Sequence, residues 1–125
     1  MTGLTLDSGA LLALERGDRS VRALLRRAAD NGLTLSIPAG VVAQTWMGGP
    51  RQARIARLLR DPGVVVVPLD AISARAVGLI CGRSGHHDIV DVHVALDARQ
   101  RGHSVVTSDP EDLRKVDPGI HLIAV

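Results

Sequence analysis

Aromatic side chains are almost absent from this chain, which has one tryptophan and no tyrosine or phenylalanine. A core made instead from Leu, Val, Ile and Ala suits a parallel sheet covered by helices. The same shortage leaves no aromatic platform for stacking nucleic-acid bases. Cysteine is nearly absent too, and the lone Cys81 excludes an intramolecular disulfide. Its apolar helical surroundings predict a small core residue.

Long apolar runs are also missing. No stretch approaches the roughly 18 residues that a membrane-spanning helix requires, and no charged-then-apolar leader opens the sequence. We therefore expect a soluble, cytoplasmic protein that has no membrane partner. The length of 125 residues predicts one domain, residues 1–125, and no repeat or linker interrupts it.

Charge of one sign does not dominate, because the net charge is only +2. The distribution is uneven, however. Residues 1–60 contain nine arginines and four acids, a net charge of +5, whereas residues 61–125 contain six basic residues and nine acids, a net charge of −3. This asymmetry predicts one basic and one acidic face.

Apolar patterns divide the chain into alternating strands and helices. Short apolar runs predict strands at residues 4–7, 33–37, 64–68, 103–109 and 120–125. Helical spacing between them predicts helices at residues 8–17, 18–32, 38–46, 51–61, 70–85, 88–102 and 110–116. The alternation predicts an α/β fold with a mainly parallel sheet of four to five strands between helix layers. The uninterrupted valines of residues 64–67 predict a strand buried on both sides.

Acidic residues gather where the predicted strands stop. Asp7 ends the first strand, Asp109 ends the fourth, and Asp112 lies three residues further on; Asp88 and Asp91 open a helix. Ligands of open α/β sheets bind beyond the carboxyl ends of the strands. Carboxylates that converge there repel one another and require a cation, and an all-oxygen pocket suits Mg²⁺ or Mn²⁺ better than zinc.

Helix capping is the competing interpretation of the same acids. The run Asp109-Pro110-Glu111-Asp112 has the composition of a helix N-terminus, with a cap, a proline and acids favoured by the helix dipole. Asp7 and Asp88 also occupy capping positions. Each acid taken alone is explained by capping, and only their joint placement favours a metal site.

Three stretches resemble PIN-domain proteins, and in particular the VapC toxins of bacterial type II toxin–antitoxin pairs. They are LTLDSGALLALERGD, IPAGVVAQTWMGGPRQARIARLL and DIVDVHVALDARQRGHSVVTSDPEDL, and they span nearly the whole chain. The resemblance implies a PIN-like three-layer α/β/α fold and a metal-dependent endoribonuclease, a hydrolase that uses Mg²⁺ or Mn²⁺. It also implies RNA as substrate, a cognate VapB-like antitoxin as partner, and a homodimer.

The resemblance also assigns roles to individual residues. Asp7, Asp91 and Asp109 correspond to the catalytic, metal-binding acids of the family. Accessory roles fall to the neighbouring polar residues Asp88, Asp112, Thr107 and Ser108.

Gln44 departs from the family pattern, which has glutamate in the helix after the second strand. A glutamine offers a neutral carbonyl oxygen without the charge, so the site either binds metal more weakly or relies on Asp88. An amide satisfied inside a helix, with no catalytic role, explains Gln44 equally well. A PIN-like module that binds RNA or a partner without cleaving is therefore the alternative function.

Basic and histidine residues complete the candidate site. Four arginines are candidates for binding the RNA backbone, namely Arg16, Arg19, Arg51 and Arg54. A solvated helix face explains at least half of the arginines, and some are candidates for antitoxin contact. The apolar residues of the first helices suit a groove for an amphipathic antitoxin helix. His86, His87 and His93 are expected to be surface or capping residues, and His86 or His87 is a candidate for contact with RNA phosphate.

An aspartyl phosphotransfer domain fits the sequence poorly. A haloacid-dehalogenase-like site needs a second aspartate two residues after the first, where this chain has Gly9. A receiver-like site needs an aspartate ending the third strand, but Asp70 follows that strand only after Pro68.

Overall fold

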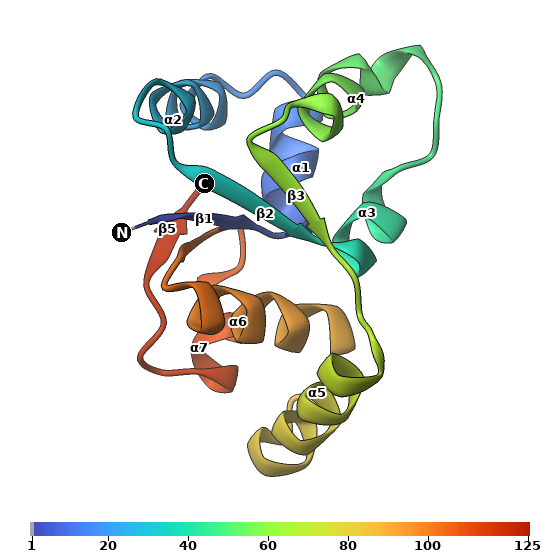
Figure 1. Ribbon diagram of the computed structural model, residues 1–125, viewed down its shortest axis with the longest axis vertical. Coiled ribbons are helices and arrows are strands. Elements are labelled where there is room, and N and C mark those ends of the chain that lie inside the picture. Colours follow the sequence, from blue (N-terminus) through green and yellow to red (C-terminus); the bar gives the residue numbers. More distant parts are fainter. Residues whose placement is uncertain (1) are drawn as a thin grey trace.

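Residues 2–125 are described by the computed structural model (Figure 1), in which strands and helices alternate as the sequence predicts. The five strands are β1 (Gly3–Leu6), β2 (Thr34–Pro38), β3 (Val64–Val67), β4 (Ser104–Thr107) and β5 (Leu122–Ala124). The helices are α1 (Ser8–Glu15), α2 (Arg19–Asp30), α3 (Ala39–Thr45), the 3₁₀ helix η1 (Pro50–Gln52), α4 (Ala53–Arg60), α5 (Ala71–Ser84), α6 (Ile89–Arg101) and α7 (Pro110–Val116). None of these helices is both long and apolar enough to cross a membrane.

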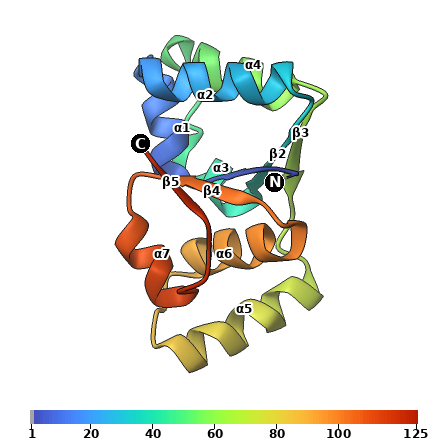
Figure 2. The ribbon, with the colours of Figure 1, turned by 90° about the vertical axis from the view of Figure 1, so that its left-hand side faces the viewer.

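All the paired strands run parallel, in the order β3-β2-β1-β4-β5. Helices α1, α2 and α4 cover one face of the sheet, and α6 and α7 cover the other (Figure 2). Helix α5 packs on α6, outside the sheet. The predicted three-layer α/β/α fold with a parallel sheet is confirmed. Because all the strands are parallel, their carboxyl ends meet at one edge of the sheet.

The two halves of the sequence largely form the two helix layers. The arginine-rich helices α2 and α4 lie on one face, and α6 and α7 lie on the other (Figure 2). Together with their N-cap residues Asp88 and Asp109, α6 and α7 carry six of the nine acids of the second half. The predicted charge asymmetry of the sequence is thus an asymmetry between the two faces of the sheet.

The prediction for β3 was wrong about burial. This strand is at the edge of the sheet and pairs only with β2, and Val65 and Val66 remain 40% and 43% exposed. An apolar run records the side chains of one strand but not how many neighbours that strand has. The prediction for Cys81 is confirmed, since its side chain is buried against Val77 and Val92.

Side chains of β1 alternate between the two faces of the sheet. Leu4 and Leu6 are almost completely buried in the main apolar core, whereas Thr5 and Asp7 point toward α6. The polar side chains of β1 therefore form a line along the α6 face, and the candidate site lies at its carboxyl end.

A buried polar cluster fixes α6 on the sheet beneath this line. The Asp97 carboxylate accepts hydrogen bonds from Ser36 Oγ at 2.6 Å, Thr5 Oγ1 at 3.2 Å and Arg101 Nε at 2.7 Å. His103 Nδ1 lies 3.1 Å from Thr5 Oγ1 and 3.2 Å from Ser36 Oγ. No buried side-chain nitrogen or oxygen in the part of the chain described lacks a partner. The register of α6, and with it the position of Asp91, depends on this cluster.

Candidate functional site

Thr107 joins the ends of the two central strands. Its hydroxyl is hydrogen-bonded to the Asp7 side chain and accepts a hydrogen bond from the Asp109 N–H at 2.9 Å. Thr107 is fully buried, so this link is shielded from water. Thr107 therefore contacts both Asp7 and the segment after β4, and its accessory role stays a prediction.

Two glycines let the surrounding helices approach closely. A Cβ on Gly9 would lie 1.9 Å from Ser108 Oγ, which places the first turn of α1 directly against the segment after β4. A Cβ on Gly40 would lie 3.0 Å from Val90 Cγ2, which places α3 against the start of α6. These contacts bring α1, α3, α6 and the β4–α7 segment to one edge.

Asp7 is a capping residue and a member of the acidic edge at the same time. Its Oδ1 accepts a hydrogen bond from the Ala10 N–H at 2.9 Å, and only 8% of the residue is exposed. Burial raises the pKa of the Asp7 carboxyl, the charge of Asp91 raises it further, and the hydrogen bonds from Thr107 and Ala10 act against this increase. The ionised form is thus strained by its surroundings in the absence of a cation.

Asp91 lies in the first turn of α6, where Asp88 caps the helix by accepting from the Asp91 N–H at 3.0 Å. The Asp91 Oδ2 atom is 3.1 Å from His86 Nε2. Burial raises the pKa of the Asp91 carboxyl, the charges of Asp88 and Asp112 add to the increase, and His86 opposes it. His86 is therefore the nearest compensating group of this acid.

Asp109 differs from the buried Asp7 and the half-buried Asp91 because it is exposed. Its pKa is raised chiefly by a hydrogen bond with the Asp112 side chain, and by burial and the Asp112 charge. Asp112 in turn lies 3.6 Å from Lys115 Nζ. The Asp112 backbone N–H acts against this increase in the pKa of Asp109. Capping hydrogen bonds thus hold Asp7 and Asp88, whereas the contacts of the Asp109 side chain are to Asp112.

The carboxylates form a series of neighbours from Asp7 through Asp91 and Asp112 to Asp109. The charge of Asp91 raises the pKa of Asp7, and the charge of Asp112 raises the pKa of both Asp91 and Asp109. Within residues 2–125, no three Asp, Glu, His or Cys side chains are gathered closely enough to hold a metal ion as they stand. In chemical kind the donors still fit a hard divalent cation, because they are carboxylate oxygens whose raised pKa values record unfavourable negative charge.

Gln44 lies beside this series, on α3. Its Oε1 accepts a hydrogen bond from Ser8 Oγ, and Ser8 directly follows Asp7. The oxygen of the Gln44 amide is therefore hydrogen-bonded to α1 at the acidic edge, and this bond fixes the direction in which the oxygen points.

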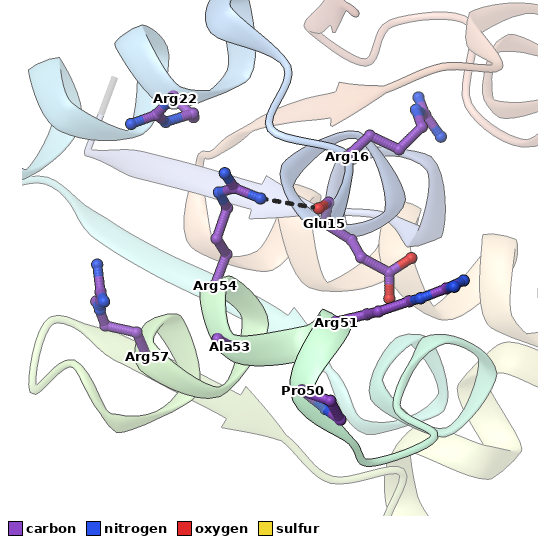
Figure 3. Close-up of a pocket in the computed structure, with 8 residues that line it drawn as sticks. All are labelled: Glu15, Arg16, Arg22, Pro50, Arg51, Ala53, Arg54 and Arg57. Atoms are coloured by element: carbon purple, nitrogen blue, oxygen red, sulfur yellow. Dashed lines mark hydrogen bonds between the residues drawn. The ribbon is translucent and has the colours of Figure 1, made fainter.

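Arginines surround a separate cavity of about 720 Å³ between α1, α2 and α4 (Figure 3). Glu15 is the one acid among the lining residues, and its backbone oxygen accepts from Arg54 Nη1 at 3.2 Å. Of the arginines predicted to bind RNA, the structure places Arg16, Arg51 and Arg54 around this cavity, and Arg19 is not part of its lining. The cavity also includes Arg22 and Arg57, which belong to the same arginine-rich stretches but were not among the four named candidates.

Several residues of the site were not foreseen from the sequence. The pairing of His86 with Asp91 joins two residues five apart, across the turn before α6. Asp97 was overlooked, although an acid within the apolar face of a helix signals a buried polar cluster. His93 was expected to be a surface or capping residue, and this was wrong. His93 is a buried residue of α6, only 4% exposed, and burial lowers the pKa of its ring.

Solved structures with this architecture include a chain of VapBC2 from Rickettsia felis bound to a DNA fragment from its promoter. The match has a TM-score of 0.72 at 16% identity and covers 98% of both chains. The fold is PIN-like. FitAB bound to the IR36 DNA fragment matches with a TM-score of 0.62 at 18% identity, over 97% of this chain and 94% of that chain.

A further PIN-like match is FitAcB from Neisseria gonorrhoeae, with a TM-score of 0.63 at 20% identity over 96% of each chain. These structures are toxin–antitoxin complexes whose toxin is a PIN domain. No protein-family model and no curated protein matches the sequence. The PIN-like fold therefore rests on the architecture.

Proposed function

We propose that this chain is a metal-dependent endoribonuclease of the VapC type, the toxin component of a type II toxin–antitoxin pair in the cytoplasm. The observation that carries the proposal is the series of carboxylates with raised pKa values at the carboxyl edge of a PIN-like sheet. Acids whose ionised forms are unfavourable without a cation are suited to bind one.

In this mechanism Asp7, Asp91 and Asp109 would hold Mg²⁺ or Mn²⁺, with Asp88, Asp112 and Gln44 beside them. The cation supplies charge stabilisation for the phosphodiester and a lowered pKa for the attacking water. Thr107 keeps the Asp7 carboxylate oriented through its buried hydroxyl, and Ser108 holds the neighbouring segment against Gly9. The arginines around the cavity attract the RNA backbone without reading its sequence.

Cleavage of single-stranded RNA in the presence of Mn²⁺, Mg²⁺ or EDTA tests this function. We expect products only with a divalent cation, and none from the Asp7→Asn variant, which retains an amide able to cap α1. Calorimetry of Mn²⁺ binding by the same two proteins separates binding from catalysis. A wild-type protein that cuts RNA equally well in EDTA contradicts metal dependence.

The second candidate is a PIN-like module that binds RNA or a partner and does not cleave. Gln44, in place of an acid, and the lack of three gathered ligands within residues 2–125 favour it. RNA binding without products, together with no measurable Mn²⁺ binding, would select this candidate.

A groove of about 560 Å³ suits the proposed antitoxin. Its apolar lining includes Leu14, Leu25, Leu33 and Leu58, and arginines stand along it. An amphipathic helix with acidic residues beside its apolar face matches both features. For the proposed homodimer, the exposed valines of edge strand β3 are the candidate contact between copies.

A further inference from the structure

The one tryptophan of the chain lies at the surface. Trp46 directly follows α3 and is 41% exposed, and the next residue, Met47, is 86% exposed. Apolar surface that stays exposed gains none of the roughly 25 cal/mol per Å² that its burial in a complex would contribute. Two large apolar side chains side by side on a connecting segment therefore call for a binding role.

The segment that carries Trp46 is held in place by a buried glutamine. Gln52 is 4% exposed, and its Oε1 accepts from the backbone N–H groups of Met47 at 2.7 Å and Gly48 at 2.8 Å. Its Nε2 donates to the Thr45 backbone oxygen and to Glu15 Oε1, the latter at 2.9 Å. A segment tied in this way presents its side chains at little entropic cost on binding.

Trp46 lies between the acidic edge and the arginine cavity along the chain. It follows Gln44 by two residues, so the two Cα atoms are at most about 7.6 Å apart. Gln44 contacts Ser8, next to Asp7, while Arg51 and Arg54 lie on the following helices. Figure 1 shows the segment from α3 to α4 on the side of the molecule where β1 and β2 end.

We propose that Trp46 stacks on one unpaired base of a single-stranded RNA, next to the nucleotide at the acidic edge. This inference rests on the proposed ribonuclease function. Single-strand binding sites combine cationic side chains along the backbone with an aromatic face for a base. The segment carries Trp46 five residues before Arg51, which lines the arginine cavity. The scarcity of aromatics excludes a platform for successive bases, and a single indole serves one base.

Intrinsic fluorescence tests the proposal directly, because Trp46 is the one aromatic residue apart from histidine. The Asp91→Asn variant is titrated in Mg²⁺ with a single-stranded RNA oligonucleotide of mixed sequence, and with the same sequence as a duplex. We expect saturable quenching by the single strand and little change with the duplex, whose bases are already stacked.

Affinity for the labelled oligonucleotide, measured by anisotropy, provides the second readout. Trp46→Ala is expected to weaken binding about 5- to 150-fold, and Trp46→Phe should retain most of the affinity. Ile72→Ala is the matched control, since Ile72 is also apolar and is 81% exposed on α5. Circular dichroism of all three variants checks that they fold.

The outcomes separate this proposal from the function on which it rests. RNA that is bound or cut without any change in fluorescence or in the affinity of Trp46→Ala overturns the stacking role alone. If neither the wild-type protein nor any of the variants binds RNA, both proposals are overturned. Quenching that depends on protein concentration without RNA, and is lost with dissociation to monomers, would assign Trp46 to contact between copies and overturn stacking.

Discussion

Asp7 shows how one side chain serves both structure and site. One of its oxygens caps α1, Thr107 donates to the carboxylate, and burial makes its ionised form unfavourable. In a fully hydrated capping aspartate, water stabilises the ionised carboxylate, so no cation is required to offset its charge. The burial of this carboxyl, more than its position in the sequence, distinguishes a site from a cap.

Asp91→Asn is expected to lower RNA cleavage about 100-fold or more, since a charged ligand becomes neutral. The unfolding midpoint should stay the same or rise slightly, because the variant removes a half-buried charge on a carboxyl whose pKa is raised. Cleavage kinetics and urea unfolding measure the two effects. Asp30→Asn, at an exposed position on α2, is the control; full activity of Asp91→Asn would leave Asp91 without a part in catalysis.

Gln44→Glu is expected to tighten Mn²⁺ or Mg²⁺ binding about 10-fold through the added charge. Ser8 can still donate to the new carboxylate, so the local geometry is retained. Calorimetry compares this variant with Gln100→Glu, an exposed position near the far end of α6. An affinity equal to or below that of the wild type would place Gln44 outside the surroundings of the metal.

At the scale of elements, the position of α6 depends on its buried acid. Asp97→Ala leaves Thr5, Ser36 and Arg101 without their acceptor and is expected to lower the free energy of unfolding by about 3–5 kcal/mol. Glu111→Ala, which breaks only an exposed ion pair with Arg114, should cost at most about 1 kcal/mol. Urea unfolding distinguishes the two, and similar small losses in both would show that the cluster does not hold α6.

The close approach of α1 to the β4–α7 segment predicts a strong effect of Gly9→Ala. The new methyl group would meet Ser108, so the melting temperature and RNA cleavage should both fall. Gly78→Ala on α5 is the matched control, because nothing lies within 4 Å of its Cβ position. There the substitution should stabilise the protein by up to about 1 kcal/mol. A melting temperature of Gly9→Ala equal to that of the wild type would contradict the tight contact between Gly9 and Ser108.

The elements themselves could be predicted from the sequence, because periodicity and turn residues act locally. The edge position of β3 could not, since its valines carry no record of how many strands flank them. The positions of Asp7, Asp91 and Asp109 at strand and helix ends could be predicted from the sequence, and their role as metal ligands stays a prediction. The pairing of His86 with Asp91 could not be predicted, because it depends on the path of the turn before α6.

At the scale of the whole molecule, stability should depend on pH through buried histidines. Burial lowers the pKa of His103 and of His93 below 6.5, so between that value and their folded pKa the unfolded chain binds protons that the native protein does not. Stability therefore falls as the pH decreases through 6.5. The acids with raised pKa act in the opposite direction at lower pH, above 3.8.

Urea unfolding in EDTA between pH 7.5 and 5.5 measures this loss. His103→Asn should reduce the pH dependence, because asparagine does not titrate and can still bond to Thr5 or Ser36. Gln100→Asn changes an exposed residue that does not titrate and should leave the slope unchanged. A slope that is identical in all three proteins would exclude His103 as a source.

The excess of arginines on one face of the sheet and of acids on the other has a consequence for how the molecule moves in solution. It gives the protein a permanent electric dipole across the sheet. A polyanion at a distance exerts a torque on such a dipole and turns the arginine face toward itself before contact. Encounter with charged chains should then be faster than random orientation permits, and this advantage should disappear as salt shortens the screening length to about 10 Å or less.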